Sequence, residues 1–315
     1  KASYNVHHLI RRTFGQVPGG MFGADENARL GYIDPRQGVE TCGLVEQMAS
    51  DEIMLCMTGD PMWAEHCEEV AFNSYPAAVM PDFKALRYIT CPNHAISDSK
   101  NHHPGIDNRG PFLSMNPFSS RCCQHNHAQG WPYFTEHLVL ATPDNGVATA
   151  IYAACKATVK VGDGKEITLH EETNYPFEEA IAFTVSTGEK VAFPFYLRIP
   201  SWTQKAEVRV NGKKVSAAPV AGKYLCINRE WANGDRVELT LPMSLSMRTW
   251  QVNKNSVSVD YGPLTLSLKI AEKYVEKDSR ETAIGDSKWQ KGADSKKWPT
   301  TEIYPDSPWN YSLVL

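Results

Sequence analysis

The chain has 315 residues, 42% hydrophobic and 22% charged, a composition typical of a globular protein. Its formal net charge is −4 and it has no basic run with interleaved aromatic residues, so nucleic-acid binding is not expected. No apolar stretch approaches the about 20 residues of a membrane-spanning helix, so no membrane insertion is expected. This length predicts two or three domains.

The two ends of the sequence suggest a piece of a longer protein. The first residue is Lys1 rather than Met, and residues 2–14 already have the pattern of the end of a helix. Residues 312–315 resemble a strand cut short. A preceding targeting segment would decide the compartment, so periplasm and cytoplasm both stay open.

Residues 40–78 have a helical pattern. Leu44, Val45 and Met48 recur near helical spacing, and the run ends before Asp60. Pro61 suits the first position of a second helix, because proline lacks only a backbone N–H that is unpaired there. The segment therefore predicts a helical hairpin.

A long stretch without periodicity follows the hairpin and continues to residue 120. It is rich in Pro, Asn, His and Gly, and it ends at the adjacent cysteines Cys122 and Cys123. Loops of this length are uncommon unless they are functional. A further helix is predicted from Gln124 to about Glu136.

From residue 137 the pattern changes to short strands separated by turns such as Asn211-Gly212 and Asn233-Gly234. Regularly spaced short strands indicate an antiparallel β-sandwich. Residues 271–305 are polar and lysine-rich, which predicts a surface excursion before another β element. The predicted strands are 147–152, 181–187, 191–199, 206–210, 224–228, 237–241 and 256–261.

Four residues form a possible metal site: Glu40, Cys42, Cys122 and Cys123. Three thiolates and one carboxylate can close a four-coordinate zinc site, and sulfur ligands favour zinc over magnesium or calcium. The spacing matches neither a zinc finger nor a zinc ribbon. The alternative is a buried cysteine pair near an unrelated glutamate, and the residues alone leave both interpretations open. Adjacent cysteines with these roles are expected in an irregular loop.

The other informative features are a glycine-rich motif and three separate cysteines. Residues 19–29 combine glycines with two adjacent acids, and Glu26 could act as a general acid if burial raises its pKa. The alternative is a surface turn followed by a solvated helix start. Cys56, Cys155 and Cys226 lie in apolar patterns and are expected to be small buried hydrophobic residues.

Residues 19–29, residues 34–42 and the run Arg121-Cys122-Cys123 together resemble the bacterial β-L-arabinofuranosidase family, glycoside hydrolase family 127. The resemblance implies a multidomain α plus β protein. The later helices of an (α/α)6 catalytic barrel are expected at 1–136, and an antiparallel β-sandwich domain at 137–250. The start of a further, incomplete β region is expected at 251–315.

The resemblance also implies a chemistry. It implies Zn2+ bound by Glu40, Cys42, Cys122 and Cys123, with Cys122 as the nucleophile and Glu26 as the acid/base. The implied enzyme is a retaining glycoside hydrolase that removes a terminal β-L-arabinofuranose, or a similar pectic side-chain sugar, from plant cell-wall oligosaccharides.

Two points limit what the resemblance implies. Ser120 and Gln124-His125 stand where members of the family often have a cysteine and prolines, which leaves the exact sugar open. The alternative function is a non-catalytic carbohydrate-binding protein with a structural zinc. Such a protein would not need an acid at Glu26, so the presence of Glu26 favours the enzyme.

Overall fold

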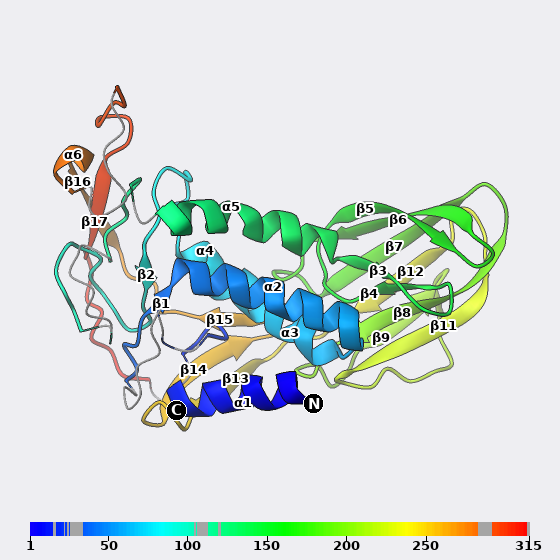
Figure 1. The fold of residues 1–315 in the computed structure, drawn as a ribbon. Coiled ribbons are helices and arrows are strands. Elements are labelled where there is room, and N and C mark those ends of the chain that lie inside the picture. Colours follow the sequence, from blue (N-terminus) through cyan, green and yellow to red (C-terminus); the bar gives the residue numbers. More distant parts are fainter. Residues whose placement is uncertain are drawn as a thin grey trace.

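The computed structural model describes residues 1–14, 17–21, 23, 25, 34–103, 105, 113–118, 121–282 and 292–313. Its longer helices lie side by side in one half of the molecule, and its two largest sheets form the other half (Figure 1). No helix within these ranges is both long and apolar enough to cross a membrane.

The predicted helical hairpin is confirmed. Helix α2 (Thr41–Thr58) ends at Gly59, whose φ of 65° is in the left-handed region and whose N–H donates to the carbonyl of Leu55. Helix α3 (Pro61–Glu69) begins with the predicted proline, and the Asp60 side chain caps it by accepting from Met62 N at 3.0 Å. A π-helical turn, η1 (Val70–Ser74), and the short α4 (Tyr75–Ala77) continue α3, and α1 (Ala2–Phe14) lies beside the hairpin.

The predicted loop position of the adjacent cysteines is wrong. Helix α5 (Arg121–Glu136) begins before them, so Cys122 and Cys123 lie in its first turn. Helix α5 packs along α2, and both helices begin at the same end of the molecule. The cysteines need no irregular backbone, because the partners that they approach come from the start of the neighbouring helix.

Two sheets share one hydrophobic core, which includes Phe183 from one sheet and Phe193, Phe195 and Trp231 from the other. The first sheet has the order β10-β9-β12-β7-β6-β5 and the second β11-β8-β4-β3. The prediction of a purely antiparallel sandwich is wrong for one pair, because β4 and β8 are parallel. Their bounds are β3 (Val139–Ala141), β4 (Val147–Thr149), β5 (Cys155–Val161), β6 (Lys165–Thr173), β7 (Ala180–Thr187), β8 (Val191–Ile199), β9 (Glu207–Val210), β10 (Lys213–Lys214), β11 (Lys223–Trp231) and β12 (Arg236–Thr240).

Beyond the sandwich, the chain returns to the helical half. Strands β13 (Leu245–Trp250), β14 (Ser256–Tyr261) and β15 (Leu264–Leu266) form one small sheet, and β16 (Glu272–Lys277) pairs with β17 (Thr300–Pro305). The short α6 (Ser279–Thr282) follows β16. The predicted surface excursion is therefore bounded by paired strands. Residues 314–315 of the predicted last strand lie outside the described residues, and 312–313 are not in a strand.

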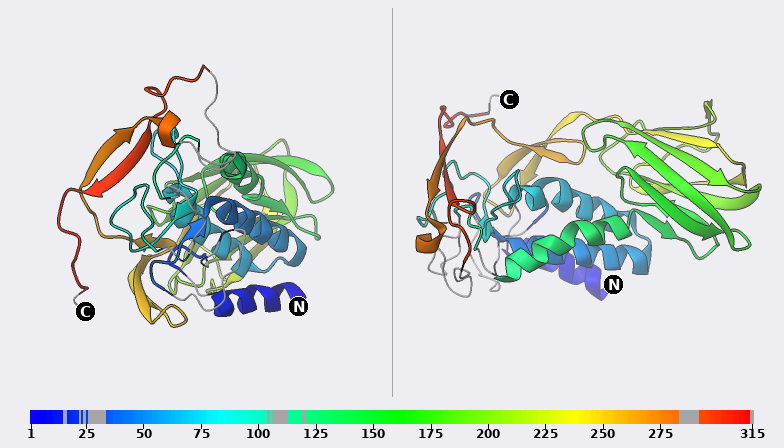
Figure 2. Two further views of the ribbon diagram at one scale, coloured as in Figure 1. Left: turned by 60° about the vertical axis from the view of Figure 1, so that its left-hand side comes forward. Right: turned by 90° about the horizontal axis from the view of Figure 1, so that it is seen from above.

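Strand β17 also closes the long loop that precedes α5. Its backbone exchanges hydrogen bonds with Ser97 and Met115, at 2.9 Å from Ser97 N to Ile303 O and 3.0 Å from Met115 N to Thr301 O. The β16–β17 hairpin stands beside this loop, at the end of the molecule opposite the sandwich (Figure 2). The loop is thus held by a strand from the far end of the sequence.

A buried ion pair joins the helices to the sandwich. The side chains of Glu68 in α3 and Arg198 in β8 are fully buried and lie 2.5 Å apart. Tyr175 OH donates to Glu68 at 2.8 Å, and Tyr152 N donates to its other oxygen at 2.9 Å. The Glu68 carboxylate therefore connects α3 to three separate places in the β half.

The predicted burial of the separate cysteines is largely wrong. Cys56 and Cys226 are exposed, and Cys155 is half-buried. Cys56 precedes the exposed Met57 on the outer face of α2. Cys226 points away from the core because its neighbour Leu225 points into it, and alternate residues of a strand face opposite sides.

Candidate functional site

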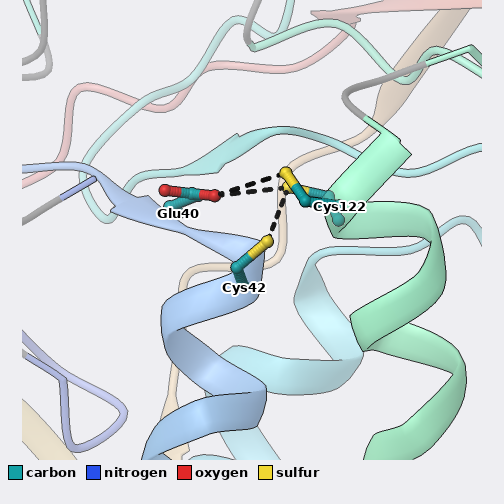
Figure 3. Close-up of side chains that lie close together, drawn as sticks. Glu40, Cys42 and Cys122 are labelled. Carbon is teal, nitrogen blue, oxygen red and sulfur yellow. Dashed lines mark hydrogen bonds between the residues drawn. The ribbon is translucent and has the colours of Figure 1, made fainter. Parts of the chain in front are cut away.

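Glu40 and Cys42 stand at the start of α2, where the backbone is fixed from outside the helix. Strand β1 (Val39–Glu40) pairs with β2 (Ile89–Thr90), and Thr41 N donates to Tyr88 O at 2.9 Å. Glu40 is the N-cap residue of α2, yet its side chain makes no capping hydrogen bond. Its carboxylate points instead toward the cysteine sulfurs, as Figure 3 shows.

The four predicted ligands come together. The Sγ atoms of Cys42 and Cys123 lie 3.4 Å apart, and Glu40 Oε1 lies 3.7 Å from Cys123 Sγ and 4.0 Å from Cys122 Sγ. One donor atom from each of the four residues lies within 4.8 Å of all the others. Tetrahedral zinc ligands stand about 3.8 Å apart for two sulfurs and about 3.5 Å for sulfur and oxygen, given the usual bond lengths. The donor set can therefore hold a metal ion and is compatible with zinc.

The close approach of the thiols shifts their pKa values in opposite directions. The hydrogen bond shared with Cys123 lowers the pKa of Cys42 to about 6, assisted by Glu40 and Asn126. The same hydrogen bond, with burial, raises the pKa of Cys123. A metal cation among the sulfurs would favour the thiolate form of all three cysteines.

Two helix N-termini meet at this cluster. Figure 3 shows α2 and α5 beginning beside the side chains of Glu40, Cys42 and Cys122. The N-terminus of a helix carries a partial positive charge, which stabilises carboxylates and thiolates placed there. A complex of Zn2+ with four anionic ligands has a net charge of about −2, and the two helix ends offset part of it.

The cluster opens onto a cavity of about 490 Å3. Cys42 and Cys122 are half-buried and line it, whereas Cys123 is fully buried behind them. The thiols of Cys42 and Cys122 are therefore the two that a molecule in the cavity can contact. The remaining lining residues are Met21, Asp25, Val39, Glu40, Gly43, Glu46, Gln47, Ser50 and Asn126.

The sequence analysis missed the polar residues of this cavity wall, although a signal was present. Glu46 and Ser50 follow Cys42 at intervals of one helical turn, and Asn126 follows Cys122 in the same way. Residues four apart on a helix share a face, so a ligand cysteine near a helix start predicts the next lining residues. The motif around Glu26 is only partly visible: Asp25 lines the cavity, and Glu26 lies outside the described residues.

Two family models match the chain. The model described as "Beta-L-arabinofuranosidase, GH127 catalytic domain" matches residues 1–136, and the one described as "GH127 middle domain" matches residues 146–243. The chain belongs to glycoside hydrolase family 127. The resemblance of residues 19–29, 34–42 and 121–123 to this family is thereby confirmed. No curated protein matches the chain.

Solved structures agree with the family assignment. A structure named "Glycoside hydrolase" is 28% identical with a TM-score of 0.62, covering 75% of this chain and 38% of its own. A GH127 β-L-arabinofuranosidase from Geobacillus stearothermophilus T6 is 20% identical with a TM-score of 0.66, covering 93% and 52%. Another GH127 β-arabinofuranosidase is 22% identical with a TM-score of 0.66, covering 85% and 46%. The chain thus spans about half the length of these structures or less.

Proposed function

We propose that the protein is a retaining glycoside hydrolase whose nucleophile is Cys122. The supporting observation is the place of this thiol, which lines the cavity and belongs to the cluster that can hold a metal. Cys42 lines the cavity as well, with its Sγ 3.4 Å from Cys123 Sγ. We assign the nucleophile to Cys122 because the family resemblance implies this role for the first cysteine of the adjacent pair.

The chemistry divides into two displacements at one carbon atom. Glu26, as the acid, donates a proton to the glycosidic oxygen while Cys122 Sγ attacks the anomeric carbon, so that a C–S bond forms and the C–O bond breaks. Glu26, now a carboxylate, takes a proton from water, which attacks the same carbon and releases the Cys122 thiolate. Two inversions give overall retention.

The metal in this proposal is Zn2+ bound by Glu40, Cys42, Cys122 and Cys123. It would keep the Cys122 sulfur as a thiolate at neutral pH and make that sulfur a better leaving group in the second displacement. The buried Glu40 and Cys123 anchor the site, since their exposed fractions are 4% and 0%.

The substrate in this proposal is an oligosaccharide of plant cell walls ending in β-L-arabinofuranose or a similar pectic side-chain sugar. The family description and the printed names of the similar structures support the sugar. The cavity supports a sugar as well, because Glu46, Gln47 and Asn126 offer hydrogen bonds to hydroxyl groups, and Met21 offers an apolar contact.

We also propose the domain division of this family for the chain. Residues 1–136 would be the C-terminal part of an (α/α)6 barrel, 137–250 a β-sandwich domain and 251–315 the start of a further β region. The extents of the two family models support the first boundaries. The exposed Val6 and Leu9 on α1 and Met57 on α2, at 51%, 56% and 74%, are apolar surfaces that neighbouring barrel helices would cover.

The first test measures metal and turnover on protein made from the complete gene without added metal. We expect about one zinc per chain by elemental mass spectrometry, lost in Cys42→Ser. Glu26→Gln should keep the zinc and lower kcat/KM for a β-L-arabinofuranoside with a poor leaving group by about 10²- to 10⁴-fold. Asp25→Asn is the matched control, since Asp25 lines the cavity beside Glu26 in sequence.

Three other outcomes would contradict the proposed acid, the catalytic function or the metal site. A larger loss in Asp25→Asn than in Glu26→Gln would transfer the acid role to Asp25. Zinc without turnover of arabinofuranosides or other pectic sugars would favour the carbohydrate-binding alternative. Absence of zinc, with all eight thiols titratable after unfolding, would remove the mechanism through Cys122.

A further inference from the structure

A chain of buried polar contacts runs from the cavity wall to the glycine-rich segment. Gln47, which lines the cavity, donates from Nε2 to Asp51 Oδ1 at 2.9 Å. Asp51 Oδ2 lies 2.6 Å from His66 Nδ1, and His66 Nε2 lies 2.8 Å from the carbonyl oxygen of Gly20. The Asp51 side chain is fully buried, and that of His66 is 10% exposed. None of these residues belongs to the thiol cluster.

The partners of His66 define where its protons are. A carbonyl oxygen only accepts, so Nε2 must carry a hydrogen and donate it to Gly20 O. Arg11 Nη2 lies 3.3 Å from Nδ1, and a guanidinium only donates. One proton is shared between Nδ1 and Asp51 Oδ2 across 2.6 Å, so the pair carries no net charge. Burial supports this neutral pair, because it raises the pKa of Asp51 and lowers that of His66 to about 3.

This group of residues is not suited to bind a metal, although His7, Asp51 and His66 come close enough to one another to bind one. Arg11 lies among them, donating from Nε to His7 Nε2 at 3.0 Å and approaching His66 at 3.3 Å. A permanent cation in this place repels a metal ion. The hydrogen bond from His66 to the carbonyl of Gly20 indicates instead that these residues fix the backbone of the glycine-rich segment.

The backbone at Gly19 and Gly20 packs against α3 and η1. Ser74 Oγ donates to the carbonyl of Gly19 at 3.0 Å, as His66 does to that of Gly20. Gly19 and Gly20 have φ values of +90° and +87°, and a Cβ on Gly19 would come within 2.1 Å of Ser74 Oγ. Two successive carbonyls are thus held by side chains from one helical element, and a larger residue at position 19 would displace Ser74 Oγ from its hydrogen bond.

The held segment leads directly into the cavity. Met21, next to Gly20, is 2% exposed and lines the cavity, and so does Asp25. Glu26, the acid of the proposed function, follows Asp25 in the sequence. We propose that His66, oriented by Asp51, is a positioning residue that fixes the backbone at Gly20, from which the chain continues to the proposed acid. This inference rests on the proposed function.

Two substitutions of His66 distinguish the role of Nε2 from that of Nδ1. His66→Gln places an amide donor near the position of Nε2 and can still bind Gly20 O. His66→Asn places its polar atoms near the position of Nδ1 and cannot reach Gly20. We therefore expect His66→Asn to disturb the acid and His66→Gln to restore most of its function, whereas a role in core stability alone would affect both variants alike.

The kinetic measurement compares two β-L-arabinofuranosides, one with an alkyl or sugar leaving group and one with a nitrophenolate leaving group. General acid catalysis matters only for the poor leaving group, and a misplacement of about 1 Å can cost about 10²-fold. In the full-length enzyme, His66→Asn should lower kcat/KM for the poor leaving group 10- to 100-fold more than for nitrophenolate. An equal loss for both substrates, with zinc retained, would overturn the proposal.

Amide hydrogen exchange supplies a measurement that does not depend on turnover. We expect faster exchange in residues 17–25 of His66→Asn than of wild type or His66→Gln, because the Gly20 anchor is lost. Unchanged exchange would overturn the anchoring role. A wild type that retains zinc but hydrolyses neither substrate would instead overturn the proposed function, while hydrogen exchange would still decide the anchoring of the segment.

Discussion

Glu40 and Glu68 are two buried carboxylates with opposite surroundings. Glu68 lies between the helices and the sandwich, with Arg198 at 2.5 Å and two further donors from the β half. Glu40 lies at the start of α2 beside three cysteine sulfurs, at the wall of a cavity. The Glu68 cluster contains its own cation and is closed. The Glu40 cluster consists only of acidic groups, and it opens onto space for another molecule.

This difference separates a structural cluster from a functional one. A buried charge is tolerated when it is paired or bound to a metal. Arg198 neutralises Glu68 from within the fold, whereas the residues of the Glu40 cluster can hold an added cation. Glu52 shows a third solution: burial raises its pKa to about 8, so a proton neutralises it. Substitutions at or beside Glu40, Glu68 and Glu52 can test these three cases one by one.

The largest effect is expected at the Glu40 cluster, which opens onto the cavity. Cys122→Ala removes the proposed nucleophile and should lower kcat by about 10⁴- to 10⁶-fold in a steady-state assay of the full-length enzyme. Zinc measured in the same samples separates the loss of the nucleophile from the loss of the metal. Cys56→Ala is the control, because this exposed thiol of α2 is far along the helix from the cluster. Retention of a tenth of the activity in Cys122→Ala would exclude the assignment.

The second-largest effect is expected at the Glu68 cluster. It concerns the free energy of unfolding and not the catalytic rate. Arg198→Met leaves the Glu68 carboxylate buried without its cation, which should cost about 3–5 kcal/mol of unfolding free energy. Denaturation midpoints of the full chain measure this loss. The double variant Arg198→Met with Glu68→Leu should recover much of it, because no charge is then left buried. Equal midpoints for wild type and Arg198→Met would show that the pair is not structural.

The smallest effect is expected at Glu52, and it depends on pH. Its carboxyl is 1% exposed and lies near Cys67 Sγ and His137 Nδ1, at 3.7 and 3.6 Å. A pKa raised from 4.5 to about 8 gives stability that is complete below pH 4.5 and lost as the pH rises through 8. Glu52→Gln should remove this loss and be more stable than wild type at pH 9, by on the order of 2 kcal/mol.

The pH series supplies its own control, since Glu52→Gln and wild type should differ little at pH 5. Asp82→Asn, at an exposed carboxyl, is the surface control for the removal of one acidic group. If Glu52→Gln and wild type lose stability in parallel between pH 5 and pH 9, then Glu52 is not neutralised by a proton.

The sequence predicted most where the signal is local. Gly59 and Asp60-Pro61 predicted the turn between the two helices of the hairpin. Strand β8 has the bounds predicted for it. Strands β5 and β6 were missed, because Lys156, Lys160 and similar residues on their exposed faces dilute the apolar pattern. The residue types alone left the grouping of Glu40 with the three cysteines open, and the family resemblance implied it. The structure brings the four side chains together.

What the sequence did not predict depends on contacts between distant segments. The helical position of Cys122 and Cys123 follows from the packing of α5 against α2, which no local pattern reports. The contact of His66 with Gly20 likewise joins residues that are far apart in sequence. The domain limits, the barrel and the role of Glu26 stay predictions that the experiments above address.

The pairing of β17 with the loop before α5 has a consequence for the order of folding. Ser97 and Met115 find their backbone partners only when residues 301–303 have been made, almost at the end of this sequence. Contacts of such sequence separation form late, because the intervening chain must first be ordered. We therefore expect the helices to form early during synthesis while the entrance to α5 waits for β17. The cluster of Glu40, Cys42, Cys122 and Cys123 would then be completed only after residues 301–303 have been made.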